Sequence, residues 1–190
     1  MTTVVLFHHA LGRTAGFLEF ADELRSAGHT VHTPDLYEGR TFTDLDEGIG
    51  HAEETGFDEV VRRGAQAADE LPNDVVYAGF SLGVMPAQYL AQRRPGARGA
   101  LLYLSAIPSS EFGSPWPGAV PLQIHMREDD PLAGEDLPAA RALVEEAADG
   151  ELFVYPGGGH LFADRDHADY DEPAARLLME RTLAFLDRVG

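Results

Sequence analysis

The stretch Asp74-Val-Val-Tyr-Ala-Gly-Phe-Ser-Leu-Gly-Val-Met-Pro-Ala-Gln-Tyr-Leu90 decides which fold this chain predicts. A β-branched apolar run leads into Gly79-Phe-Ser-Leu-Gly83, and a segment with a helical pattern follows. Gly-x-Ser-x-Gly between a strand and a helix is the nucleophile elbow, a turn so tight that its flanking positions tolerate almost no side chain. The motif predicts Ser81 at the apex in a strained backbone conformation. The amide of Leu82 would open the helix and point at an oxyanion formed there.

Short apolar runs alternate with amphipathic segments along the rest of the chain. Strands are predicted near residues 4–8, 30–33, 75–78, 100–105, 122–126 and 151–155. Helices are predicted near residues 14–27, 56–71, 82–94, 136–148 and 173–189, with Asp136 as the N-cap of the fourth. Such alternation favours parallel strands joined by right-handed crossovers, and hence an α/β sheet covered on both faces. Two stretches without periodicity, 34–55 and 106–119, are predicted to be long loops.

The composition limits the classes of protein to which the chain can belong. Its 190 residues, 44% of them hydrophobic, suit a single domain, 1–190, with a sizeable core. The 14 Lys and Arg against 32 Asp and Glu give a net charge of −18, which disfavours nucleic acid and anionic membranes as partners. There is no cysteine, which excludes disulfides and thiolate metal sites. We expect a cytoplasmic protein, because no leader precedes residues 4–7 and no apolar run approaches the roughly 20 residues that span a bilayer. The oligomeric state is not predicted.

Three polar candidates follow predicted strands, at the sheet edge where open α/β sheets bind ligands. Ser81 follows the third strand, the pair Asp129-Asp130 the fifth and His160 the sixth. The order Ser, Asp, His is that of α/β-hydrolases. A serine hydroxyl needs a base within hydrogen-bond reach, and a carboxylate holds the other ring nitrogen of that base. Asp130 is preferred over Asp129 because Pro131 follows it where the loop should turn. The spacing of His160 and His167 fits no metal motif, so no metal or cofactor is expected.

Several landmarks carry a resemblance to a known family. They are His32-Thr-Pro-Asp-Leu-Tyr37, Gly79-Phe-Ser-Leu-Gly83, Ile124-His-Met-Arg-Glu-Asp-Asp-Pro131, Tyr155-Pro-Gly-Gly-Gly-His-Leu-Phe-Ala163 and Glu180-Arg-Thr-Leu-Ala-Phe-Leu186. Through them essentially the whole chain resembles the dienelactone hydrolase family of α/β-hydrolases. The resemblance implies a catalytic triad of Ser81, Asp130 and His160, and an oxyanion hole made by the amides of Leu82 and Ala10. We expect a minimal α/β-hydrolase fold with six parallel strands in the order 2-1-3-4-5-6.

The chain departs from that family at three positions. Dienelactone-cleaving members use a cysteine nucleophile where this chain has Ser81. They carry an acidic residue where this chain has His9, and an arginine that grips the substrate carboxylate where it has Asp164, although Arg165 is adjacent. With a net charge of −18, these changes favour an ester, lactone or thioester of a small neutral molecule. His9 has two interpretations: it lines the pocket and assists or gates the serine, or it is a loop histidine bonded to backbone.

The sequence therefore predicts a serine hydrolase acting on a small-molecule ester or lactone through an acyl-serine intermediate. Aromatic residues in or next to the two long loops are candidate pocket walls: Tyr37, Phe42, Phe112 and Trp116. Packing over the sheet edge is the alternative for the last two. Two other functions stay open, namely an inactive hydrolase-fold module that binds a ligand or partner, and an acyltransferase that uses the same triad.

Overall fold

The computed structural model describes all residues, 1–190, and is built on one six-stranded sheet. The strands are β1 (Thr3–Phe7), β2 (Thr30–His32), β3 (Val76–Phe80), β4 (Gly99–Tyr103), β5 (Leu122–Arg127) and β6 (Gly150–Tyr155). Their order is β2-β1-β3-β4-β5-β6, and every neighbouring pair is parallel. The predicted sheet and its strand order are confirmed.

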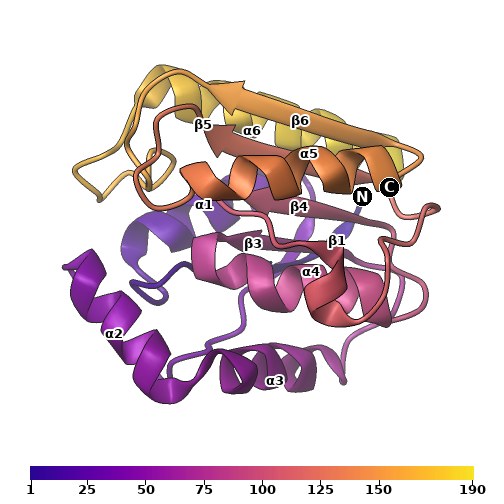
Figure 1. Cartoon of the computed structure of the whole chain (residues 1–190), viewed down its shortest axis with the longest axis horizontal. Helices are drawn as coiled ribbons and strands as arrows, with labels where there is room; N and C mark the ends of the chain where they lie inside the picture. The colour runs from indigo at the N-terminus through magenta and orange to yellow at the C-terminus, as the bar shows by residue number, and fades with distance from the viewer.

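Six helices cover the two faces of this sheet. They are α1 (Ala15–Ser26), α2 (Leu45–Thr55), α3 (Phe57–Ala68), α4 (Val84–Arg93), α5 (Leu137–Glu146) and α6 (Glu172–Val189). Side chains alternate along β1, so that Val4 and Leu6 join the apolar cluster under α1 and α6. Val5 and Phe7 join the cluster formed with α3, α4 and α5. Figure 1 shows α4 and α5 in front of the sheet and α6 behind it.

The helix α2 lies inside the stretch that was predicted to be a loop, and that prediction was wrong. Its fully buried positions are the small residues Gly48 and Ala52, so the helical spacing of Leu45, Ile49 and Ala52 makes only a short, weak hydrophobic period. The sequence signal for this helix lies at its N-terminus, where the Asp44 side chain accepts a hydrogen bond from the amide of Glu47. Asp followed by Glu three residues later is an N-terminal capping pattern. The stretch 106–119 holds only the short 3-10 turn Ser109–Phe112.

The carboxyl ends of the parallel strands meet at one edge of the sheet. In Figure 1 the arrowheads of β5 and β6 point to the left, toward the side on which α2 lies. The segments that leave β1, β3, β4, β5 and β6 therefore gather at this edge. None of the helices combines the length and the apolar character that crossing a membrane requires.

Candidate active site

Ser81 lies directly after β3, in the 3-10 turn Ser81–Gly83 that opens α4. Its φ is +49°, a conformation that residues with a side chain rarely adopt. A Cβ added to Gly79 would overlap the carbonyl of Gly83. A Cβ on Gly83 would in turn overlap the carbonyl oxygens of Phe7 and His8. The two glycines are thus required by close backbone approach, and the strained apex predicted for Ser81 is present.

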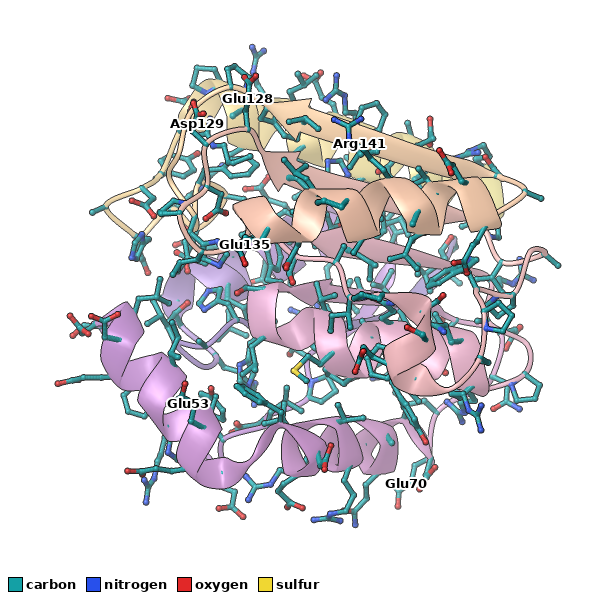
Figure 2. All side chains as sticks on the ribbon, viewed as in Figure 1. Glu53, Glu70, Glu128, Asp129, Glu135 and Arg141 are labelled. Atoms are coloured by element: carbon teal, nitrogen blue, oxygen red, sulfur yellow. The ribbon has the colours of Figure 1, made fainter.

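The imidazole of His160 joins Ser81 to Asp130. Its Nε2 lies 2.8 Å from Oγ of Ser81, and its Nδ1 lies 2.6 Å from Oδ2 of Asp130. The other carboxylate oxygen of Asp130 accepts hydrogen bonds from the amides of Leu132 and Ala133 at 2.9 and 3.3 Å. Asp129 is exposed, and Figure 2 shows it at the outer edge of the molecule. The structure thus brings Asp130 to the histidine, and leaves Asp129 outside.

Electrostatics assigns the protons in this relay. Burial alone would raise the pKa of the Asp130 carboxyl, but hydrogen bonds from His160 and from two backbone amides, with the charge of His160, hold that pKa below its ordinary value. The ionised carboxylate accepts the Nδ1–H of His160, so Nε2 is left as the acceptor for the Ser81 hydroxyl. The His160 side chain is only 5% exposed and that of Asp130 is fully buried, whereas Ser81 is partly exposed. The arrangement can remove a proton from a hydroxyl that faces an incoming molecule.

Arg127, at the end of β5, anchors the loop that carries His160. Its guanidinium donates to the carbonyl of Pro156 before that histidine, and to Oδ2 of Asp171 after it at 2.7 Å. The guanidinium also lies over the ring of Phe162, 4.4 Å from the ring centre. The side chain is almost fully buried. Sequence reasoning missed this residue, although an arginine at the end of a predicted buried strand is itself a signal, because a buried charge requires partners.

The two amides expected to form an oxyanion hole have free donors. The amide of Ala10, in the segment after β1, donates to no backbone or side-chain acceptor in the protein. Leu82 lies in the first turn of a helix, where amides have no intrahelical partner. The helix α2 packs against the same segment, because a Cβ on Gly48 would overlap the carbonyl of Ala10. The helix that the sequence did not reveal therefore supports the segment that carries one of the two donors.

His9 is paired with Asp164. Its Nε2 lies 2.8 Å from Oδ2 of Asp164, and its Nδ1 accepts the amide of Leu11 at 3.2 Å. Asp164 also accepts from Oγ1 of Thr14 at 3.0 Å and from the amide of Asp166 at 2.9 Å. Burial would raise the pKa of the Asp164 carboxyl, but these hydrogen bonds and the charge of His9 lower it. Since both ring nitrogens of His9 have partners, its side chain holds the loop and neither nitrogen is free to act on Ser81.

A hollow of about 190 Å³ lies beside Ser81 and His160. Its other walls come from α2 and from the segments after β4 and β5: Leu45, Ile49, Leu104, Ser105, Leu132, Ala133 and Asp136. Leu104 has a φ of +70°, the second strained non-glycine residue at this edge. Such strain in a buried residue often accompanies a functional site. Of these wall residues, Leu104 and Ser105 come directly after β4, and that position was the only sequence signal for them.

The aromatic residues predicted as pocket walls lie elsewhere. Tyr37 is fully buried, and its hydroxyl donates to the carbonyl of Gly48 at 3.3 Å. Trp116 is buried, with its indole Nε1 donating to Val120 at 2.9 Å. Phe112 packs beside Tyr89 in a separate hollow on the α3–α4 side, with the ring centres 5.9 Å apart. Phe42 lines yet another hollow, near Asp164. These rings were predicted to line the site because they lie near the sheet edge in sequence, but they pack against other apolar groups instead.

A sheet of this order with a strand–turn–helix elbow at Ser81 defines an α/β-hydrolase. The profile of the Dienelactone hydrolase family matches residues 1–190, and the chain belongs to that family. It is therefore a hydrolase-class enzyme. No group of three or more histidine and carboxylate side chains is arranged to hold a metal ion.

One sequence relative and several solved structures are similar to this chain. A pyrethroid hydrolase of Sphingobium wenxiniae is 31% identical over 107 residues, 56% of this chain but 36% of the relative's own length. A dienelactone hydrolase-like promiscuous phosphotriesterase from metagenomic libraries has a similar structure, with a TM-score of 0.76 and 17% identity over 100% of this chain and 87% of that one. A cold-adapted esterase from an Arctic intertidal metagenomic library gives a TM-score of 0.70 at 20% identity over 98% and 82% of the two chains. At these identities the solved structures support the fold.

Proposed function

We propose that this protein hydrolyses an ester, lactone or thioester of a small molecule, with Ser81 as nucleophile, His160 as general base and Asp130 as the orienting acid. The observation that carries the proposal is the pair of distances at His160, 2.8 Å to the Ser81 hydroxyl and 2.6 Å to the Asp130 carboxylate. Nucleophile, base and orienting group within hydrogen-bond reach are what acyl transfer through serine requires. The esterase and pyrethroid hydrolase activities named for the relatives belong to the same reaction class.

The reaction begins when His160 takes the hydroxyl proton of Ser81 and the oxygen attacks the substrate carbonyl. The oxyanion is held by the amides of Leu82 and Ala10, which have no other acceptor to give up. Asp130 stabilises the imidazolium and keeps its tautomer. His160 then protonates the departing alcohol or thiol, and an acyl-serine remains. Water deprotonated by His160 attacks this ester, and collapse of the second oxyanion returns the proton to Ser81.

The size and charge of the site support a small substrate. A hollow of about 190 Å³ accommodates a short acyl or alcohol group, and mainly leucine, isoleucine and alanine side chains line it. The net charge of −18 disfavours phosphate backbones and anionic surfaces as partners. The chemistry uses only side chains and water, so the proposal includes no cofactor.

Labelling with a fluorophosphonate probe, followed by assays on short-chain nitrophenyl esters and several lactones, tests this proposal. The wild-type protein should label at Ser81 and turn over at least one ester, and Ser81→Ala should lose labelling and about 10⁴-fold or more of kcat/KM. Ser110→Ala is the matched control, because Ser110 is exposed and makes no side-chain hydrogen bond. Full activity in Ser81→Ala would refute the assignment.

The same assay separates the two alternative functions. An inactive binding module would neither label nor hydrolyse. An acyltransferase would label and would transfer the acyl group to an added alcohol in preference to water, which product analysis detects.

A further inference from the structure

Asp136 occupies the N-cap position of α5, but its side chain does not cap the helix. The sequence predicted an N-cap, yet its carboxylate accepts no hydrogen bond from the first turn of that helix. Instead Oδ2 accepts the hydroxyl of Ser105 at 2.7 Å and lies 3.4 Å from the amide of Ala106. The N-cap position was predicted correctly, but the carboxylate does not bond to the helix because these donors, in the segment after β4, engage it. As a result, the charge of Asp136 is turned toward the hollow that holds Ser81 and His160.

This carboxylate is the only side chain lining the hollow that is charged at neutral pH, apart from His160 when it is protonated. Neither lysine nor arginine lines it. Five of the nine lining residues are apolar, and Oδ1 of Asp136 makes no hydrogen bond within the protein. The hollow thus offers an apolar surface with one free anionic acceptor.

We infer that Asp136 is a specificity-determining residue that sets the charge of the substrate. The hollow takes an ester or lactone whose apolar body carries an ammonium group or another hydrogen-bond donor, and it rejects substrates that carry a carboxylate. A carboxylate in this partly desolvated space meets a like charge, whereas an ammonium group meets an opposite one. This inference rests on the proposed function, because it names the substrate class of the same site.

Three nitrophenyl esters of equal chain length provide the test. Their acyl groups are monoanionic glutarate, cationic trimethylammonio-butanoate, and dimethylhexanoate, the neutral carbon analogue of the cation. Rates of alkaline hydrolysis of the three esters correct for their intrinsic reactivity. The variant Asp136→Asn removes the charge and keeps an oxygen that accepts from Ser105. Asp136→Ser, which also keeps an oxygen, provides the same comparison should the asparagine variant fold poorly.

The matched control is Glu135→Gln. Glu135 is exposed, makes no hydrogen bond or ion pair, and does not line the hollow. Figure 2 shows it beside the start of α5, next in sequence to Asp136. Both substitutions change the net charge by one, but only that of Asp136 removes the charge from the hollow.

The wild-type enzyme should have its highest corrected kcat/KM on the cationic ester and its lowest on the anionic one. Asp136→Asn should lower the ratio of the cationic to the anionic value by about tenfold or more and change the value for the neutral ester by a smaller factor than either, while Glu135→Gln leaves the ratio within about twofold. Equal effects of Asp136→Asn on all three esters, or equal shifts in the two variants, would overturn the inference while the proposed function stands. No turnover of any ester and no fluorophosphonate labelling would overturn both.

Discussion

The imidazole of His9 and the carboxylate of Asp164 form a buried pair across 155 residues of sequence, with Nε2 and Oδ2 2.8 Å apart. The side chains are 2% and 4% exposed. One partner precedes Ala10, whose free amide is proposed to bind the oxyanion, and the other follows His160 in the same loop. The pair therefore connects the segment of the oxyanion donor to the loop of the proposed base.

Removing the charge of Asp164 should weaken this connection. In Asp164→Asn the NH2 group must face either the two donors that now bond to Oδ2, His9 and Thr14, or the amide of Asp166 that bonds to Oδ1. Loss of such a charged hydrogen bond costs about 1.5–3 kcal/mol in the free energy of unfolding. We expect a fall of this size in urea denaturation. We also expect kcat to fall by about tenfold with KM little changed, because a displaced oxyanion donor affects the transition state more than substrate binding. Asp166→Asn is the control, since that side chain is exposed and unbonded. Identical kinetics in the two variants would show that the pair serves stability alone.

Two glycines of α2 should respond to alanine in opposite directions. Gly48→Ala would place a methyl group against the carbonyl of Ala10. We expect it to lose about 1–3 kcal/mol of stability, as overpacked sites do, and to lower kcat by displacing the Ala10 amide. A Cβ at Gly50 meets nothing, so Gly50→Ala should stabilise the protein by about 0.5–1 kcal/mol. Thermal unfolding and steady-state kinetics of both variants test this. Retention of full kcat in Gly48→Ala would contradict a role for α2 in placing that amide.

Arg127→Met should loosen the loop that carries His160. It removes the donors to the Pro156 carbonyl and to Asp171. The Asp171 side chain is 38% exposed, so solvent screens this ion pair. We expect the free energy of unfolding to fall by about 1–3 kcal/mol. The rate of esterase turnover should fall more than KM changes, because the base is less well placed. Arg62→Met removes an exposed pair with Glu59, so it should leave stability almost unchanged and kinetics unchanged. If Arg127→Met behaved like Arg62→Met in both assays, the anchoring role would be wrong.

Buried neutral histidines should make the fold sensitive to mild acid. Burial lowers the pKa of His125 to about 3 and that of His8 to about 4, from an ordinary value of 6.5. The unfolded chain therefore binds protons that the folded chain does not, and stability is lost as the pH falls from about 6.5 toward these folded values. Thermal unfolding measured between neutral pH and about pH 4 should show this decline. His125→Gln should flatten part of it, and an unchanged slope in that variant would show that His125 is not a source.

Much of the fold could be predicted because its signals are local. Short-range sterics explain the apolar run before Ser81 and the glycines on either side of it. Burial on two faces of a sheet explains the alternation of strands with helices, and both signals lie within short stretches of sequence. The helix α2 escaped detection because its fully buried residues, Gly48 and Ala52, are small and its hydrophobic period is short. Its capping residues Asp44 and Glu47 were the readable signal.

The meeting of Ser81, Asp130 and His160 was predictable from chain order, because the ends of parallel strands converge at one edge. That they act as a triad stays a prediction. Only the tertiary structure shows that Asp130, and not Asp129, contacts His160. It also shows that His9 pairs with Asp164, and that the carboxylate of Asp136 bonds to Ser105 beside the hollow and not to its own helix. It also placed Tyr37 and Trp116 in the core and built the hollow from leucine, isoleucine and alanine. These outcomes depend on which donors compete for each carboxylate and on how distant loops pack. That competition takes place between groups far apart in the sequence, so the order of residues alone does not reveal it. Local backbone sterics, by contrast, depend only on residues that are neighbours in the chain.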